Sequence, residues 1–274
     1  MSGLALVLGA GSNHFVVVPF DGPERYYLAG GALGPVPLIF AADGRLVLWV
    51  SRPDFLDPSV FTIDSVDGRR IARVRPRVAQ FAPAALNATH SRIAFWTGAE
   101  GRPTTQLNWA TFDFSGGGAV DQTDGTCSWS PDGRTLAYEK NGQVYTFDVS
   151  SRSSKRLLLG HDPSWTPRGR LIAYRDPNGR ASLATDTGSA LDWPLSTHKV
   201  IGSIRWSPDG RYVSLLEALP HPSPTGAAYH LLVARITDGA FVSVKELGIR
   251  TDSFYWITEY QRFCTHCAPG EPFN

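Results

Sequence analysis

Histidine, carboxylate and basic side chains recur in the short polar segments between the strand-like stretches of this 274-residue sequence. A histidine beside an aspartate can transfer protons, and an arginine or lysine can stabilise negative charge that develops on a substrate. The same groups around a concave mouth can also hold a ligand without changing it. The candidate binding residues of this kind are Arg77, Asp124, His161, Asp162, His198, Lys199, Arg250 and Asp252.

Other motifs that could do chemistry remain incomplete. Cys264 and Cys267 have the spacing of a zinc knuckle, but a structural zinc site needs four ligands and the sequence shows no second pair. A disulfide and a reduced pair both stay open for these cysteines. The glycines of Gly9-Ala-Gly11 precede a strand-like segment, whereas a dinucleotide site needs a helix there. No Gly-x-Ser-x-Gly nucleophile elbow occurs. We therefore assign no catalytic residue, no metal and no cofactor.

Charge and hydropathy restrict the class of partner. The 26 basic and 25 acidic residues leave a formal net charge of +1, and no long basic run occurs, which argues against nucleic acid. No apolar run reaches the roughly 18 residues of a membrane span. The first ten residues lack the basic head of a signal peptide. We expect no membrane span and no signal peptide, and the compartment stays open between cytoplasm and periplasm.

An internal repeat indicates what positions the candidate residues. Trp-Ser-Pro-Asp-Gly occurs at 129–133 and at 206–210, with Trp-Thr-Pro-Arg-Gly between them at 165–169. The tryptophans are 36 and 41 residues apart, a period typical of stacked repeats. Proline presets one turn corner, aspartate bonds locally and glycine accepts a left-handed conformation. Each pentapeptide therefore predicts a tight hairpin, with Asp43, Asp132 and Asp209 as turn formers and the tryptophans packed between repeats.

The residues after Trp129 show the content of one repeat. Strand-like segments at 135–139, 143–149 and 155–159 follow the tryptophan strand, with turns at 140–142 and 150–154. Four antiparallel strands in about forty residues make the blade of a β-propeller. Weaker copies begin at Phe40 and Phe81, and we expect a hairpin lengthened through 84–90 in the second.

The full set of markers predicts an all-β, six-bladed propeller, with seven blades as the alternative. Three N-terminal strands and one C-terminal strand share the closing blade, which removes exposed sheet edges. The markers are Phe40, Phe81, Trp129, Trp165, Trp206 and Trp256. The predicted single domain, residues 1–274, has blades at about 36–75, 76–122, 123–159, 160–198, 199–248, and 249–274 with 1–35.

The repeat resembles that of the TolB family of WD40-like propellers. There the pentapeptide is followed by a basic residue, Leu or Ile, Ala, and Phe or Tyr, and then by a tyrosine-containing strand that ends in Asp. Residues 129–148 match this pattern closely, the next two blades match in part, and the others match only in outline. The resemblance implies the propeller fold. The family includes interaction modules, the propeller halves of prolyl-oligopeptidase-like enzymes and sugar-active proteins, so it narrows the function little.

In such a propeller, the connectors from each fourth strand to the next first strand lie around one mouth of the central channel. All eight candidate residues fall in these connectors. We favour a non-catalytic binding module that presents one face to a protein or peptide partner, in which the proline-rich segment 219–226 is a stiff docking loop. The alternatives are a carbohydrate-active protein, either lyase, hydrolase or lectin, that takes an oligosaccharide at the mouth, and a structural domain of a longer chain.

Overall fold

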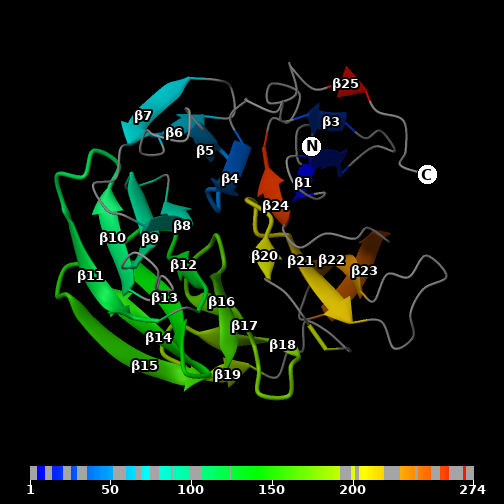
Figure 1. The fold of residues 1–274 in the computed structure, drawn as a ribbon. Helices are drawn as coiled ribbons and strands as arrows, with labels where there is room; N and C mark the ends of the chain where they lie inside the picture. Colours follow the sequence, from blue (N-terminus) through cyan, green and yellow to red (C-terminus); the bar gives the residue numbers. More distant parts are fainter. Residues whose placement is uncertain are drawn as a thin grey trace.

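The computed structural model describes residues 5–9, 14–20, 26–29, 36–51, 60–65, 69–74, 80–87, 89, 91–98, 106–123, 125–191, 199–200, 204–218, 229–237, 240–247, 254–258 and 268–269. All regular secondary structure in these residues is β-strand. The strands form six antiparallel sheets around a common centre, as blades of a propeller (Figure 1). The predicted all-β, six-bladed fold is confirmed.

Five blades each contain four consecutive strands. Blade 1 comprises β4 (Val36–Phe40), β5 (Leu46–Ser51), β6 (Val60–Ser65) and β7 (Arg70–Val74). Blade 2 comprises β8 (Gln80–Asn87), β9 (Arg92–Gly98), β10 (Gln106–Thr111) and β11 (Gly117–Gln122). Blade 3 comprises β12 (Cys127–Trp129), β13 (Thr135–Lys140), β14 (Gln143–Asp148) and β15 (Ser153–Leu159). Blade 4 comprises β16 (His161–Trp165), β17 (Leu171–Arg175), β18 (Ala181–Thr185) and β19 (Ala190–Leu191). Blade 5 comprises β20 (Arg205–Trp206), β21 (Tyr212–Ala218), β22 (Tyr229–Thr237) and β23 (Ala240–Leu247).

Blade 6 joins the two ends of the chain, as predicted. Its strand order is β24 (Phe254–Ile257), β1 (Ala5–Gly9), β2 (His14–Pro19), β3 (Tyr26–Ala29) and β25 (Ala268–Pro269). The fifth strand, β25, pairs with the outer edge of β3 and was not predicted. The first strands of successive blades contact one another around the ring, and β24 contacts β4. The ring is thus closed by contacts between the last blade and the first.

The Pro-Asp-Gly turns fold as their residue types require. In blade 3 the Gly133 N–H donates to the Ser130 carbonyl at 2.8 Å, and Gly133 has a φ of 66°. The Ser130 hydroxyl donates to Asp132 Oδ1 at 2.6 Å, and the Arg134 N–H donates to the same oxygen at 3.1 Å. Blade 5 repeats these bonds with its own serine and aspartate. Asp132 and Asp209 are therefore turn formers, as predicted.

Blade 2 corrects one prediction. The strand β8 does not end near Phe81 but continues to Asn87, and Leu86 pairs with Ile93 as Trp129 pairs with Leu136. The marker of this blade is therefore Leu86, and residues 84–87 extend the strand instead of lengthening the hairpin. The Asn87 side chain is buried and donates to the Ser130 carbonyl at 3.0 Å.

The marker tryptophans pack on small residues of the preceding blade. Each small residue lies on a second strand, and each tryptophan lies in the first strand of the following blade. Ala94 and Trp129, Ala137 and Trp165, and Ala173 and Trp206 each share a core cluster, and Ser214 bonds Trp256 directly. Where the marker is the smaller Leu86, the corresponding residue is the larger Leu48 in the same core cluster. The summed volume of the two side chains is thus kept roughly even around these blades.

Only one of these four tryptophans has a partner for its indole N–H among the described residues. Trp256 Nε1 donates to Ser214 Oγ at 2.9 Å, whereas the buried Nε1 atoms of the other three make no hydrogen bond. The difference follows from the residue opposite each ring, because serine offers an acceptor and alanine does not.

We therefore predict that Ser214→Ala lowers the free energy of unfolding by about 1–2 kcal/mol, since it leaves a buried donor unsatisfied. The substitution also removes the bond from the Ser214 hydroxyl to the Arg205 carbonyl. Urea denaturation measures the change. Conversely, Ala137→Ser should raise the stability, because it places a hydroxyl beside the Trp165 indole.

The control for this prediction is Ser182→Ala, at a half-buried serine of β18 that makes no side-chain hydrogen bond to a described residue. This variant should stay within about 0.5 kcal/mol of the wild type. Equal losses in the Ser182 and Ser214 variants would contradict the role of the indole bond.

Candidate functional site

The structure describes three of the eight predicted site residues. His161 and Asp162 begin the first strand of blade 4, and Lys199 lies in the connector to blade 5. The other five predicted residues, Arg77, Asp124, His198, Arg250 and Asp252, lie outside the described residues. The convergence of all eight residues on one mouth therefore stays a prediction.

His161 and Asp162 meet a carboxylate that the sequence analysis did not select. His161 Nδ1 lies 2.6 Å from Glu139 Oε1, and the Asp162 N–H donates to Glu139 Oε2 at 3.1 Å. Arg175 Nε donates to Asp162 Oδ2 at 2.9 Å. Glu139 lies in β13 of blade 3 and Arg175 ends β17 of blade 4, so this cluster connects two blades. Because both Glu139 oxygens are engaged, the cluster is built to hold the connector in place.

A second polar group ties blade 2 to blade 3 beside this cluster. Asp121 accepts from Lys140 Nζ at 2.6 Å and from the Tyr138 hydroxyl at 2.8 Å. Burial raises the pKa of Asp121, but these two bonds outweigh it and leave the pKa below the ordinary value. Asp121 therefore stays charged and paired in the folded protein. The described residues at this end of blades 2 to 4 therefore include two charged pairs, Lys140 with Asp121 and Arg175 with Asp162.

The opposite face, which carries the first hairpin of each blade, has a cavity at the centre. Its volume is about 160 Å³. Its walls come from the turns and first-strand ends of blades 1 to 5. The lining residues are Ala42, Asp43, Leu86, Asn87, Thr89, Trp129, Ser130, Pro131, Trp165, Pro167 and Pro208. We call this cavity the turn-face mouth.

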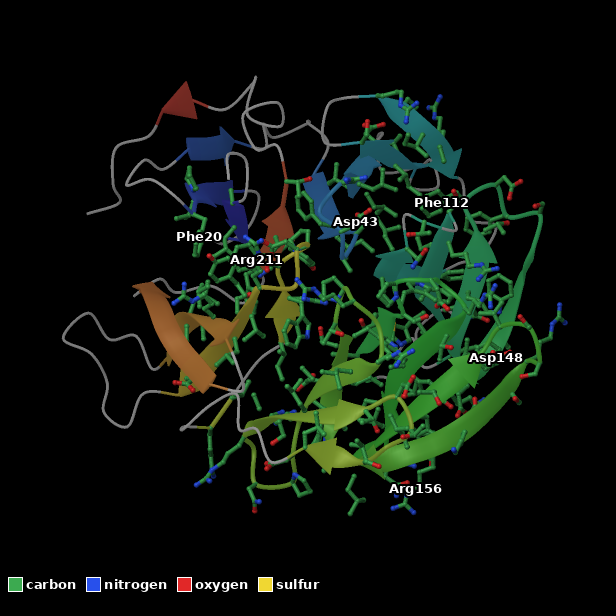
Figure 2. The ribbon with its side chains drawn as sticks, turned by 180° about the vertical axis from the view of Figure 1, so that it is seen from behind. Phe20, Asp43, Phe112, Asp148, Arg156 and Arg211 are labelled. Carbon is green, nitrogen blue, oxygen red and sulfur yellow. The ribbon has the colours of Figure 1, made fainter. Side chains whose placement is uncertain are left out.

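Asp43 is the one charged side chain among the described residues of the turn-face mouth. It occupies the turn position of Asp132, but Ala41 replaces the serine whose hydroxyl would bind it. Its carboxylate accepts the Arg45 N–H at 3.1 Å and makes no other hydrogen bond with a described neighbour. Burial raises the pKa of Asp43, and the Arg45 bond only partly opposes this. Figure 2 labels Asp43 toward the centre of the ring.

The turn-face mouth continues into the central channel. The channel has a volume of about 50 Å³ and shares Ala42, Leu86, Trp129 and Trp165 with the mouth. The free thiol of Cys127 lines the channel, and burial raises its pKa to about 12. This thiol is therefore not a nucleophile at neutral pH. The described residues contain no cluster of three or more His, Cys, Asp or Glu suited to a metal ion.

Several solved structures are similar to this chain in fold. A protein of unknown function from Desulfotomaculum acetoxidans DSM 771 matches at a TM-score of 0.57 and 15% identity, over 89% of this chain and 80% of the other. A protein from Agrobacterium tumefaciens provisionally assigned as TolB matches at 0.57 and 15%, over 93% and 98%. A chain of the mitotic checkpoint complex matches at 0.50 and 14%, over 89% and 74%. The likeness shows the propeller fold. No family model and no curated relative match the chain.

The likeness to TolB agrees with the fold that the repeat pattern implied, while membership of that family stays a prediction. In the part of the chain that the structure describes, no helix is long and apolar enough to span a membrane.

We predict that Asp43→Asn makes the protein more stable at pH 7. The raised pKa means that the folded state favours the protonated Asp43 side chain. The stability gained from this preference is present below the ordinary pKa of 3.8 and is lost as the pH rises through the pKa of the folded state. Asparagine keeps the acceptor for Arg45 without the charge. Thermal unfolding at pH 7 and pH 3 should show a gain that shrinks at the lower pH.

The matched control is Asp209→Asn in the turn of blade 5. Asp209 is exposed, and its carboxylate accepts the Ser207 hydroxyl at 2.6 Å and the Arg211 N–H at 3.0 Å. Its replacement should leave the stability at pH 7 unchanged or lower. A loss of stability at pH 7 in the Asp43 variant would show that the charge is satisfied.

Proposed function

We propose that this propeller is a non-catalytic binding module that takes a segment of a protein or peptide partner at the turn-face mouth. The observation that carries the proposal is the incompletely paired carboxylate of Asp43 in a cavity walled by tryptophan and proline rings. Carboxylates that are turn formers elsewhere in the repeat are paired with a serine, so Asp43 departs from the repeat at the point where a ligand can reach it.

The size of the mouth favours one side chain over a whole small molecule. Pockets that enclose a small-molecule ligand have volumes of roughly 300–1,000 Å³, well above the 160 Å³ of this cavity. A lysine or arginine fits its chemistry, because the aliphatic stem packs on the tryptophan and proline rings while the charged end pairs with Asp43. We therefore expect the partner segment to insert a basic residue.

The rim of the mouth supports docking without a large entropic cost. Pro131, Pro167 and Pro208 stand in tight turns whose backbone bonds are already formed. Rigid, ring-lined pockets surrounded by backbone-ordered loops are typical of the anchor points that dominate protein interfaces. A mitotic checkpoint propeller of similar fold is itself found in a protein complex.

The carbohydrate-active alternative rests on the predicted connector-face residues. Of these, His161 and Asp162 are bound to Glu139 and Arg175, and so are engaged in holding two blades together. The other residues on which this alternative depends lie outside the described residues: Arg77, Asp124, His198 and Arg250. The alternative therefore has less support than the binding module, and the connector-face site remains a separate proposal.

The binding module predicts a sequence-specific peptide preference. Random dodecapeptides displayed on phage and selected on the immobilised protein should enrich a motif with one constant lysine or arginine. Replacement of that residue by norleucine, or Asp43→Asn in the protein, should weaken binding at least tenfold in a fluorescence-polarisation titration, because each removes a charge-assisted bond.

Asp209→Asn is again the control, because Asp209 holds the same turn position in blade 5 but is not itself among the residues that line the mouth. It should bind the selected peptides like the wild type. Selected peptides that bind the Asp43 variant unchanged would place the binding surface elsewhere. Failure to enrich any motif would remove the support for a peptide partner.

A further inference from the structure

Arg205 carries a charge in the central channel without a carboxylate partner among the described residues. Among the described residues that line the channel, it is the one charged side chain. Its Nε is buried and makes no hydrogen bond, and its guanidinium lies over the ring of Tyr255 at 5.2 Å from the centroid. Arg205 is half-buried as a whole, and a charge that loses part of its hydration is stabilised by a partner, because desolvation of an isolated charge is costly.

Other arginines of the structure show what is missing at Arg205. Arg175 pairs with Asp162, and Arg70 pairs with Asp64. Arg92 also has a buried Nε without a partner, but its Nη1 donates to the carbonyl of Gly133. No side chain or carbonyl among the described residues accepts a hydrogen bond from the Arg205 guanidinium. Its remaining N–H donors are available to a ligand in the channel.

The neighbouring blades contribute further donors at the same level. Ser128 and Ser164 pair with Ala137 and Ala173 as Arg205 pairs with Ser214, so the three residues occupy equivalent positions in blades 3, 4 and 5. All three line the channel. Ser128 Oγ accepts a hydrogen bond from the backbone N–H of Trp165 at 3.1 Å, which leaves the hydroxyl proton of Ser128 free to donate. A cation and two hydroxyls therefore lie around a channel without an acidic side chain among its described lining.

The size of the channel limits the ligand to a few atoms. Its volume of about 50 Å³ is roughly three to five times the 10–15 Å³ that one water needs. A carboxylate group with its α-carbon has four non-hydrogen atoms, and its two oxygens match the paired N–H groups of a guanidinium.

We propose that the central channel is a binding site for a single carboxylate group, held by Arg205 with Ser128 and Ser164 as additional donors. The carboxylate belongs either to a small free acid or to the C-terminus of a peptide. The site is independent of a partner at the turn-face mouth, because a small acid can occupy it alone.

Thermal unfolding in sodium acetate tests the site, with sodium chloride replacing acetate at constant ionic strength. The wild type should become more stable as acetate replaces chloride, because a ligand of the folded state shifts the unfolding equilibrium. Arg205→Met should raise the acetate dissociation constant roughly ten- to a hundredfold, as expected for loss of hydrogen bonds to a charged group. Arg235→Met, at an exposed arginine in the same blade, should respond like the wild type.

Two further measurements keep the test decisive. Saturation transfer from the wild-type protein to the acetate methyl group should be seen by NMR, and this does not depend on whether the Arg205 variant folds.

N-acetyl-Gly-Gly should stabilise the wild type, whereas its amide should not. Binding of the peptide acid more tightly than acetate identifies a chain terminus as the source, and the reverse order identifies a small acid. Absence of saturation transfer, or equal responses to the acid and the amide, would overturn the proposal.

Discussion

The spacing of the blades in the ring depends on the packing of each marker residue against one side chain of the preceding blade. That side chain is small where the marker is tryptophan and larger where the marker is leucine. Tryptophan meets alanine or serine at four blade junctions, and Leu86 meets the larger Leu48 at a fifth. Close packing tolerates a change of shape better than a change of total volume. Combining a large marker with a small partner, or a smaller marker with a larger partner, therefore keeps neighbouring blades at a similar spacing. The regular spacing of the tryptophans in the sequence therefore reflects this packing between blades, and a Pro-Asp-Gly turn fixes the positions of Trp129 and Trp206.

The part of the fold that rests on local chemistry could be predicted from the sequence. Pro-Asp-Gly specifies its hairpin within five residues, and Trp256 with the N-terminal strands correctly indicated the closing blade. Blade 2 was misread because Phe81 resembles a marker, whereas the true position is decided by the pairing of Leu86 with Ile93 across the strands. The two-residue strand β25 depends on a distant partner, β3, and has no local signal of its own.

The candidate sites were harder to predict for a related reason. The polar connectors directed attention to His161 and Asp162, but Glu139 was missed because it lies in a strand whose sequence resembles that of any other blade strand. Asp43 and Arg205 were missed because each occupies a position whose role in the repeat is structural. Their signal is a departure from the repeat: alanine replaces serine at position 41, and arginine stands where blades 3 and 4 have serine.

These two departures lie along one axis, and neither is required by the ring. Blades 3 and 4 close with serine at the level of Arg205, and the turns of blades 3 and 5 form with a fully bonded aspartate. An incompletely paired charge that is partly desolvated lowers stability, which is why both proposed sites are centred on these residues. The turn-face mouth and the channel share the walls of Trp129 and Trp165.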